Sequence, residues 1–190
     1  MKNRFLTSRQ LLACLLLALP CASVYGSQGE PLPAGSQLSQ FTLPAPDSQQ
    51  TLNYLGLKAM DPYTVSQIET KFVLIEILSA VCSQCQANAP VLNRLYQAIQ
   101  KDADLARDVK IIGVCIGNEK TEIDAFKKSA KVSFPLIQDE NYAVVQAVEV
   151  TETPTMVLVT REGKVLWSHS GVIKDFDGLL KDVRENIKKQ

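Results

Sequence analysis

An apolar run at Phe72–Leu78 stands just before two cysteines that open an amphipathic segment. Glu76 is the only charged residue in that run, which is typical of a strand buried on both faces of a sheet. Cys82 and Cys85 follow, and apolar side chains then recur at helical spacing to about Gln100. They are Ala87, Val91, Leu92, Leu95, Tyr96 and Ile99. A doubly buried strand that leads into a helix requires a helix-covered sheet.

The rest of the chain supplies further strands and helices. Apolar runs predict strands over 110–116, 155–160 and 164–168, the last two joined by a turn at 161–163. Helical spacing predicts helices over 121–130, 142–148 and 176–188, with Thr121 and Asp124 at the start of the first. We expect 134–136 to be an extended link. The order β-α-β-α-β-β-α predicts an α/β fold with a central mixed sheet flanked by helices.

The N-terminus has the pattern of an export signal. Three cations precede an apolar run at Leu11–Pro20, and small residues follow up to Gly26. The run is shorter than the about 20 residues that cross a bilayer. We expect residues 1–26 to be a signal peptide and the mature protein to be periplasmic. An uncleaved N-terminal anchor is the alternative.

Two segments follow the predicted signal peptide. Residues 27–50 are rich in Gly, Pro, Ser and Gln, and they are predicted to be a short extension, a linker with an edge segment around Phe41–Leu43. Residues 51–190 are predicted to be the folded domain.

Charge and histidine content exclude several function classes. Lys and Arg number 20, as do Asp and Glu, so there is no electrostatic case for nucleic acid as a partner. A single histidine, His169, excludes metal sites that need two imidazoles. No dimerisation segment is evident, and we expect a monomer.

The pair Cys82 and Cys85 is the strongest functional signal. Export would remove Cys14 and Cys21, leaving this pair and Cys115. A two-residue spacing closes almost no loop, so it makes a poor structural staple. At the start of a helix, free amides and the helix dipole favour a thiolate on the first cysteine. The second lies one turn inside and can resolve a mixed disulfide. The pattern favours a redox couple over a structural bridge or a metal clip.

Other residues surround this couple in the prediction. Glu76 lies six residues before Cys82, and its burial would raise its pKa and let it exchange a proton with Cys85, directly or through water. Pro154 stands where a cis-proline would bring backbone beside the sulfurs. We expect Cys115 to be an inert buried residue and His169 to lie at the surface.

These motifs resemble the thioredoxin-like superfamily, and the exported context resembles its TlpA/ResA branch. The resemblance covers about Phe72 to the C-terminus. It rests on Cys82-x-x-Cys85-x-x-x-x-Pro90, Thr153-Pro154-Thr155, Gly163 and Gly171. It implies a thioredoxin-like fold in which Cys82 attacks, Cys85 resolves and Pro154 is cis.

The resemblance also implies substrates and partners. Thr153, Ser83 and Gln84 would bind substrate, with no cofactor and no metal. Disulfide-containing exported proteins would be reduced or exchanged, for example in cytochrome c maturation, with electrons from a thiol protein, expected to be membrane-bound. Two positions depart from the family: Val81 replaces an aromatic residue, and Asn88 replaces an acidic residue of some reductases.

Two other functions remain open from the sequence. Ser79 and Cys82 have the spacing of a peroxiredoxin-like peroxidase, although Ile75 stands where such sites usually hold proline. The thiol pair could instead bind Cu(I), with Met156 and His169 as candidate third ligands.

Overall fold

A mixed sheet forms the centre of the computed structural model, which describes residues 32–150 and 152–190. The predicted signal peptide, 1–26, lies outside the described residues. The strands are β1 (Phe72–Leu78), β2 (Val109–Ile116), β3 (Leu136–Asp139), β4 (Thr155–Thr160) and β5 (Val165–Ser170). They lie in the order β3-β2-β1-β4-β5. β1, β2 and β3 are parallel, whereas β4 is antiparallel to both β1 and β5. The predicted α/β fold is therefore confirmed.

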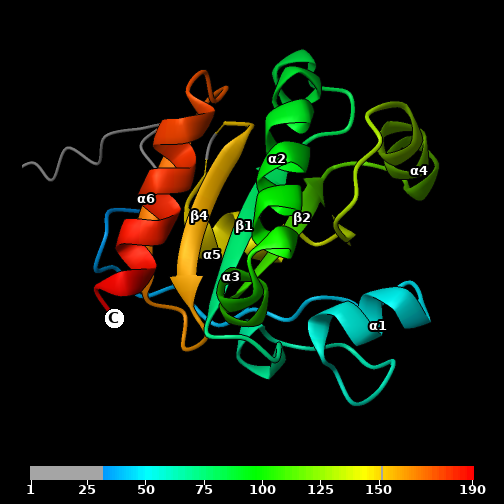
Figure 1. Ribbon diagram of the computed structural model, residues 1–190. Coiled ribbons are helices and arrows are strands. Elements are labelled where there is room, and N and C mark those ends of the chain that lie inside the picture. The colour runs from blue at the N-terminus through cyan, green and yellow to red at the C-terminus, as the bar shows by residue number, and fades with distance from the viewer. Residues whose placement is uncertain (1–31, 151) are drawn as a thin grey trace, which may run out of the picture.

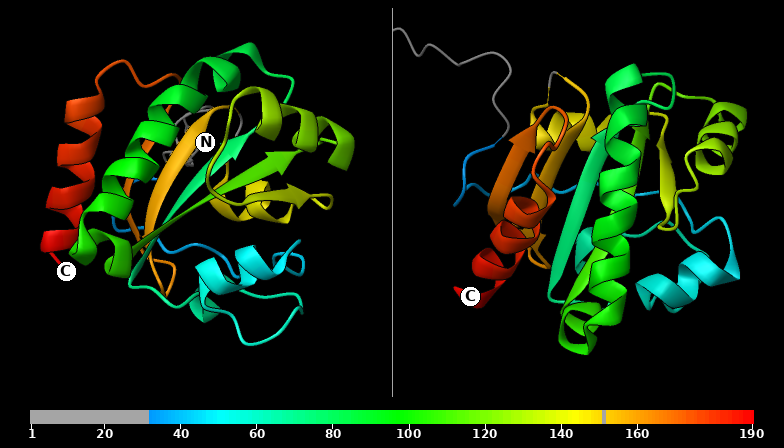
Figure 2. Two further views of the ribbon diagram at one scale, coloured as in Figure 1. Left: turned by 45° about the vertical axis from the view of Figure 1, so that its right-hand side comes forward. Right: turned by 45° about the horizontal axis from the view of Figure 1, so that its top comes forward.

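Helices cover both faces of the sheet. The described helices are α1 (Gln49–Leu55), α2 (Ser83–Lys101), α3 (Ala103–Asp108), α4 (Lys120–Ser129), α5 (Ala143–Val148) and α6 (Phe176–Lys188), with a short 3₁₀ turn at Val65–Gln67. Figure 1 shows α2 and α6 side by side in front of the sheet and α5 behind it. Figure 2 gives the same two layers from other angles. Separate buried clusters fill the two sides.

The central strand supports the loop that carries the two cysteines. All seven residues of β1 are buried, and the strand pairs along its length with β2 and β4. Such a strand has no solvent-facing side, so its apolar run is continuous instead of alternating. Glu76 is only 2% exposed at its centre. The end of β1 therefore holds the loop to α2 on a fixed base.

β3 corrects the prediction of an extended link at 134–136. Only four residues form this strand, too few for a period to stand out in the sequence. Its position depends on pairing with β2, in which Gly113 faces Leu136. A Cβ atom at Gly113 would lie 2.5 Å from Leu136 Cδ2. The glycine therefore makes room for the edge strand.

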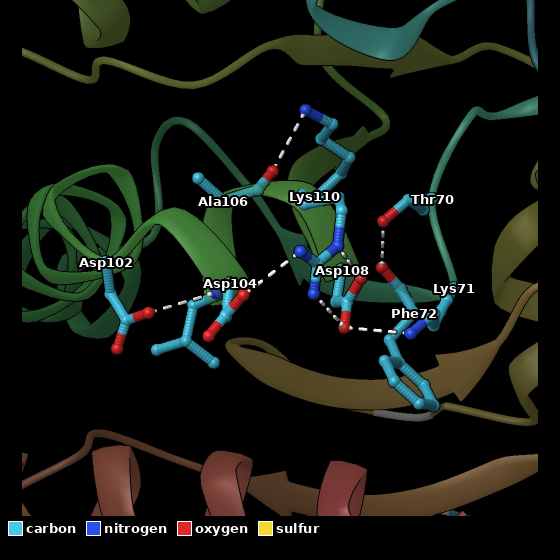
Figure 3. Close-up of polar contacts among 10 residues, drawn as sticks. Thr70, Lys71, Phe72, Asp102, Asp104, Ala106, Asp108 and Lys110 are labelled. Atoms are coloured by element: carbon cyan, nitrogen blue, oxygen red, sulfur yellow. Dashed lines mark hydrogen bonds and ion pairs between the residues drawn. The ribbon is translucent and has the colours of Figure 1, made fainter.

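The helix α3 was also missing from the predicted order. Asp102 ends α2 and caps α3, because the Leu105 amide donates to its Oδ1 at 3.2 Å. Ion pairs then join Asp108 to Lys71 at 3.0 Å and to Arg107 at 2.9 Å. Figure 3 shows this polar cluster, beside the start of β1.

Helix boundaries differ slightly elsewhere. α4 begins one residue before Thr121 and is capped by Glu119, whose amide pairs with Glu122 in a capping box. The sequence favoured Thr121 or Asp124 as the start because these are common caps. On α2, Ala87 is exposed although it fitted the apolar stripe, and Asn88 is buried in its place.

The described part of the N-terminal segment runs beside β5. Gly35 donates to the Val165 carbonyl at 2.8 Å, and Val165 donates to Ser36 at 2.8 Å. Further on, Leu43 forms an isolated antiparallel bridge with Tyr63. Among the helices of the described ranges, none is long and apolar enough to cross a membrane.

Candidate active site

Cys82 and Cys85 lie at the start of α2, at the end of the loop that follows β1. Cys82 is the N-cap residue of the helix and is partly exposed. Its carbonyl accepts the first helical hydrogen bond from Gln86 at 3.0 Å. Cys85 is one turn further on and only 1% exposed. Both are free thiols. Because Cys82 is partly exposed and Cys85 is buried, a large substrate can reach the sulfur of Cys82 but not that of Cys85.

The two thiols differ in proton affinity for physical reasons. Partial burial alone would raise the pKa of Cys82, but the backbone amides of Cys85 and Gln84 favour the thiolate, and the net pKa is lowered. Deep burial raises the pKa of Cys85 to about 12. Cys82 is therefore the better nucleophile, and Cys85 stays protonated until a base takes its proton.

The loop before β4 approaches these sulfurs as the sequence predicts. The Thr153–Pro154 peptide bond is cis, and the Cys82 thiol donates to the Thr153 carbonyl at 3.7 Å. The Thr155 hydroxyl donates to the Glu152 carbonyl at 2.9 Å. Gly171 donates to the Pro154 carbonyl at 2.8 Å. These bonds hold backbone groups beside the exposed thiol.

The surface around Cys82 is open to a partner. Val81, immediately before it, is 67% exposed. Ser83 and Gln84 are exposed, and Thr153 is half-buried. The three residues predicted to bind substrate thus surround one accessible sulfur, and an apolar side chain stands beside it.

Glu76 lies beneath the site, on the face of β1 that α2 covers. Its burial raises its pKa to about 7, partly offset by a hydrogen bond from Asn88. The Asn88 amide nitrogen donates to Glu76 Oε1 at 3.1 Å. A buried carboxyl with such a pKa can accept or release a proton near neutral pH. The sequence did not assign Asn88 to the site; its position three residues after Cys85, on the same helix face, was the available signal.

Cys115 is buried on β2, as predicted. Its exposure is 0%, and burial, together with the charges of Glu76 and Cys85, raises its pKa to about 12. These neighbours place a third thiol on the same side of the sheet as the couple. With so high a pKa it is a poor nucleophile at neutral pH.

The surface position expected for His169 is wrong. The residue is half-buried inside β5, where its ring stacks on Trp167 with centroids 6.0 Å apart. Its Nε2 is buried and has no hydrogen-bond partner among the described residues. Pairing with β4 extends β5 to Ser170, which turns the expected strand end into an interior position.

The described residues include no cluster of three or more His, Cys, Asp or Glu side chains arranged to hold a metal. Met156, the other candidate ligand for Cu(I), is fully buried opposite Glu76. Ser79, which suggested a peroxidase by its spacing from Cys82, contacts the other thiol of the pair. The Ser79 backbone amide donates to Cys85 Sγ at 3.5 Å, a contact with the buried thiol.

Asn118, like Asn88, was not predicted from the sequence to belong to the site. It holds the loop before Cys82 in place. Asn118 is 5% exposed. Its Oδ1 accepts from the Ala80 amide at 2.8 Å, and its Nδ2 donates to Glu122 at 3.1 Å. Asn118 thereby joins the site loop to the start of α4. Nothing local in the sequence marks it, since its partners are 38 and four residues away.

Comparisons with known proteins show what this chain is similar to. The Redoxin family model matches residues 28–183. The thiol-disulfide oxidoreductase ResA of Bacillus subtilis is 28% identical over 122 residues, covering 62% of this chain and 65% of that protein, just under two thirds of its length. ResA of Geobacillus thermodenitrificans is 24% identical over 190 residues, covering 98% of each.

Solved structures share the fold. A secreted Mycobacterium tuberculosis disulfide oxidoreductase, homologous to Escherichia coli DsbE, superimposes with a TM-score of 0.58 at 17% identity, over 77% of this chain and 96% of that one. The thioredoxin domain of a thiol-disulfide oxidoreductase from Bacteroides vulgatus gives a TM-score of 0.60 at 18% identity, over 81% and 97%.

Proposed function

The chain belongs to the Redoxin family, as a thioredoxin-like protein of the TlpA/ResA type, and we propose that it is a thiol–disulfide oxidoreductase that reduces disulfides in exported proteins. The observation that carries this proposal is the asymmetry of the thiol pair. One sulfur is accessible with a lowered pKa, and the other is buried with a raised pKa. That is the division of labour that stepwise disulfide reduction needs.

The reaction proceeds in two exchanges. The Cys82 thiolate attacks one sulfur of the substrate disulfide, forming a mixed disulfide and releasing the other substrate sulfur as a thiolate. Cys85 then loses its proton and attacks Cys82 Sγ. This forms the Cys82–Cys85 disulfide and releases the second substrate thiolate. The substrate gains two electrons, and the pair on the enzyme is oxidised.

Glu76 is proposed as the proton acceptor for Cys85. Its carboxyl is buried on the side of the sheet that carries α2, and its pKa of about 7 leaves it partly ionised, and so able to take up a proton, near neutral pH. A bridging water would carry the proton between them. In the reverse half-reaction, when an electron donor reduces the enzyme, Glu76 returns that proton.

The cis-proline loop is proposed to orient the substrate. The Thr153 carbonyl lies next to the Cys82 sulfur, and Ser83 and Gln84 border the same sulfur from the start of α2. A substrate chain laid between these two segments would bring its disulfide in line with the attacking thiolate. Pro154 fixes the course of the loop at this point.

The proposal also covers the location of the protein and its partners. Residues 1–26 are proposed to direct the chain to the periplasm, and the resemblance to a protein described as secreted supports this. Each turnover leaves the enzyme oxidised, so a thiol protein has to return two electrons; we propose a membrane-bound donor. Apocytochrome c, whose C-x-x-C-H motif needs both thiols reduced, is the substrate to try first.

The test is disulfide reduction by three cysteine variants. Insulin and an oxidised apocytochrome peptide serve as substrates, with a small dithiol as electron source. Cys82→Ser is expected to abolish turnover, and Cys85→Ser to accumulate a mixed disulfide visible by mass spectrometry. Cys115→Ala is the control and is expected to retain activity.

Any of three results would contradict the proposal. Wild-type rates from the Cys82→Ser variant would remove this thiol from the reaction. Rapid Cys82-dependent loss of hydrogen peroxide, without disulfide reduction, would favour a peroxidase. Binding of one equivalent of Cu(I) that resists a chelator would favour the metal-binding alternative.

A further inference from the structure

Asn88 connects three elements beneath the thiol pair. It lies on α2 three residues after Cys85, with an exposure of 0%. Its Nδ2 donates to Glu76 Oε1 on β1 at 3.1 Å. Its Oδ1 accepts from the Ile173 amide, in the loop between β5 and α6, at 3.0 Å. A buried polar side chain at a core position is expensive unless both ends are bonded, and here both are.

The Ile173 contact fixes which way the amide points. A backbone N–H can only donate, so the Asn88 atom that faces it has to be the oxygen. The NH₂ group is then directed at Glu76 and can only donate to it. The amide therefore cannot turn round to accept a hydrogen bond from the carboxyl. Glu76 is held in one orientation by a donor whose own orientation is fixed from the other side.

A fixed donor has a definite effect on the carboxyl. A hydrogen bond to a carboxylate oxygen favours the ionised form. Burial raises the pKa of Glu76 to about 7, and the Asn88 bond limits that rise. Without the bond, a smaller fraction of Glu76 would be ionised at neutral pH. The carboxyl would then be less available to accept a proton.

Other titratable groups near Glu76 do not offer an equivalent contact. Cys115 on β2 senses the charges of both Glu76 and Cys85, but its own pKa is about 12. From β4 the register partner is Met156, which does not titrate. His169, on β5, pairs with Met156 on β4. It therefore lies two strands away from Glu76, or about 10 Å. Asn88 is the only side chain that hydrogen-bonds the carboxyl among the described residues.

We propose that Asn88 is a positioning residue for the resolving step: it orients Glu76 and keeps the carboxyl ionised so that it can receive the proton of Cys85. This inference rests on the proposed function. In the step concerned, the proton of Cys85 passes to Glu76, the Cys85 thiolate attacks Cys82 Sγ, the Cys82–Cys85 bond forms, and the mixed disulfide breaks to release the substrate thiolate. Asn88 touches none of the reacting sulfurs.

The resolving step can be timed with dithiobis-nitrobenzoate, an aromatic disulfide that releases a coloured thiolate. Reduced protein releases one thiolate when Cys82 attacks and a second when Cys85 resolves the adduct. Stopped-flow measurement of the second release across pH 5 to about 10 gives the pH midpoint of the resolving step, a property of the coupled Glu76–Cys85 pair.

The matched variants are Asn88→Leu and Asn93→Leu. Asn93 lies on the same helix and also uses both ends of its amide, donating to Ala130 at 2.9 Å and accepting from Ser133 at 3.2 Å. Its replacement therefore removes two comparable bonds away from the thiols. Asn88→Leu is expected to raise the midpoint by about one pH unit, and so to slow the resolving step about tenfold below it. Asn93→Leu is expected to leave the midpoint unchanged.

A second measurement covers the case in which Asn88→Leu fails to fold. Carbon-13 labelling of Glu side chains gives the titration of Glu76 in the wild type, assigned by loss of its signal in Glu76→Gln. Its midpoint is expected to coincide with that of the second release. A Glu76 midpoint that differs from that of the second release would show that the carboxyl takes no part in the resolving step, and this would overturn the role of Asn88.

The two proposals fail in different ways. If wild-type protein releases a second thiolate but Asn88→Leu has the same pH midpoint as Asn93→Leu, Asn88 has no part in the step and the oxidoreductase proposal stands. If the wild type releases no second thiolate at any pH, the proposed function fails, and this inference fails with it.

Discussion

Cys82 and Cys85 acquire different chemistry from a difference of one helical turn. Cys82 meets the free amides of the helix N-terminus, whereas Cys85 points into the core. The environment therefore gives two identical side chains different proton affinities, which suit the attacking and resolving roles proposed for them. Glu76 belongs to the same arrangement, since its burial brings its pKa to about 7.

The buried carboxyl has a consequence for stability. Its pKa rises from 4.5 to about 7 on folding, so between these values the folded chain holds a proton that the unfolded chain has lost. The stabilisation is complete below about pH 4.5 and is lost as the pH rises through about 7. We expect the free energy of unfolding of the reduced wild type to fall by about 3 kcal/mol across this window, relative to Glu76→Gln.

Urea unfolding of both reduced proteins at pH 4 to about 8 measures this difference. Other titrating groups are common to the two proteins, and their contributions cancel in the comparison. Parallel pH dependences for the wild type and Glu76→Gln would mean that Glu76 titrates with an ordinary pKa.

At the scale of elements, the site depends on the loop between β1 and α2. Ala80 in this loop is 5% exposed, and its amide donates to Asn118. Asn118→Ala leaves that buried donor without a partner, and we expect a loss of about 1–3 kcal/mol in the free energy of unfolding. Asn53→Ala, on the exposed face of α1, is the control and is expected to change stability by less than about 0.5 kcal/mol.

Urea unfolding of the two variants measures these costs. The loosened loop is also expected to slow thiol attack by Cys82 in the first, coloured release described above. Equal stability of Asn118→Ala and the wild type would show that the loop does not need this bond.

Elements with a strong local pattern could be predicted from the sequence. The bounds of β1, β4 and α6 agree with the predicted runs, and Cys82 and Cys85 lie at the expected junction. β3 could not be predicted, because it depends on pairing with β2. α3 could not be predicted, because Asp102 both ends α2 and caps the start of α3. Asn88 and Asn118 were missed for a related reason: their partners belong to other elements.

At the scale of the whole molecule, the fold brings segments that are distant in the sequence together around the accessible sulfur of Cys82. The N-terminal segment from Leu32 lies along β5, where the Ser168 hydroxyl donates to the Leu32 carbonyl at 3.0 Å. The central sheet and its two helical layers hold the loop of Thr153 against the start of α2. The proposed function thus depends on segments about 70 residues apart.

Export predicts a defined mature N-terminus. Cleavage after Gly26 would yield a protein that begins at Ser27. Mass spectrometry of the protein recovered from the periplasm of an expressing cell is expected to give that mass. Recovery of the uncleaved chain in the membrane fraction would instead support an N-terminal anchor.

We propose that Cys82 and Cys85 form a reversible couple on the reducing side. Hydrogen bonds from two backbone amides and from the side chains of Thr153 and Cys85 favour the Cys82 thiolate. The less a thiolate is stabilised, the more readily the reduced form donates electrons. A thiol-trapping titration in defined redox buffers measures the reduction potential. We predict one two-electron couple closer to about −270 mV than to about −120 mV. A value near about −120 mV, or the absence of any reversible disulfide, would contradict the account.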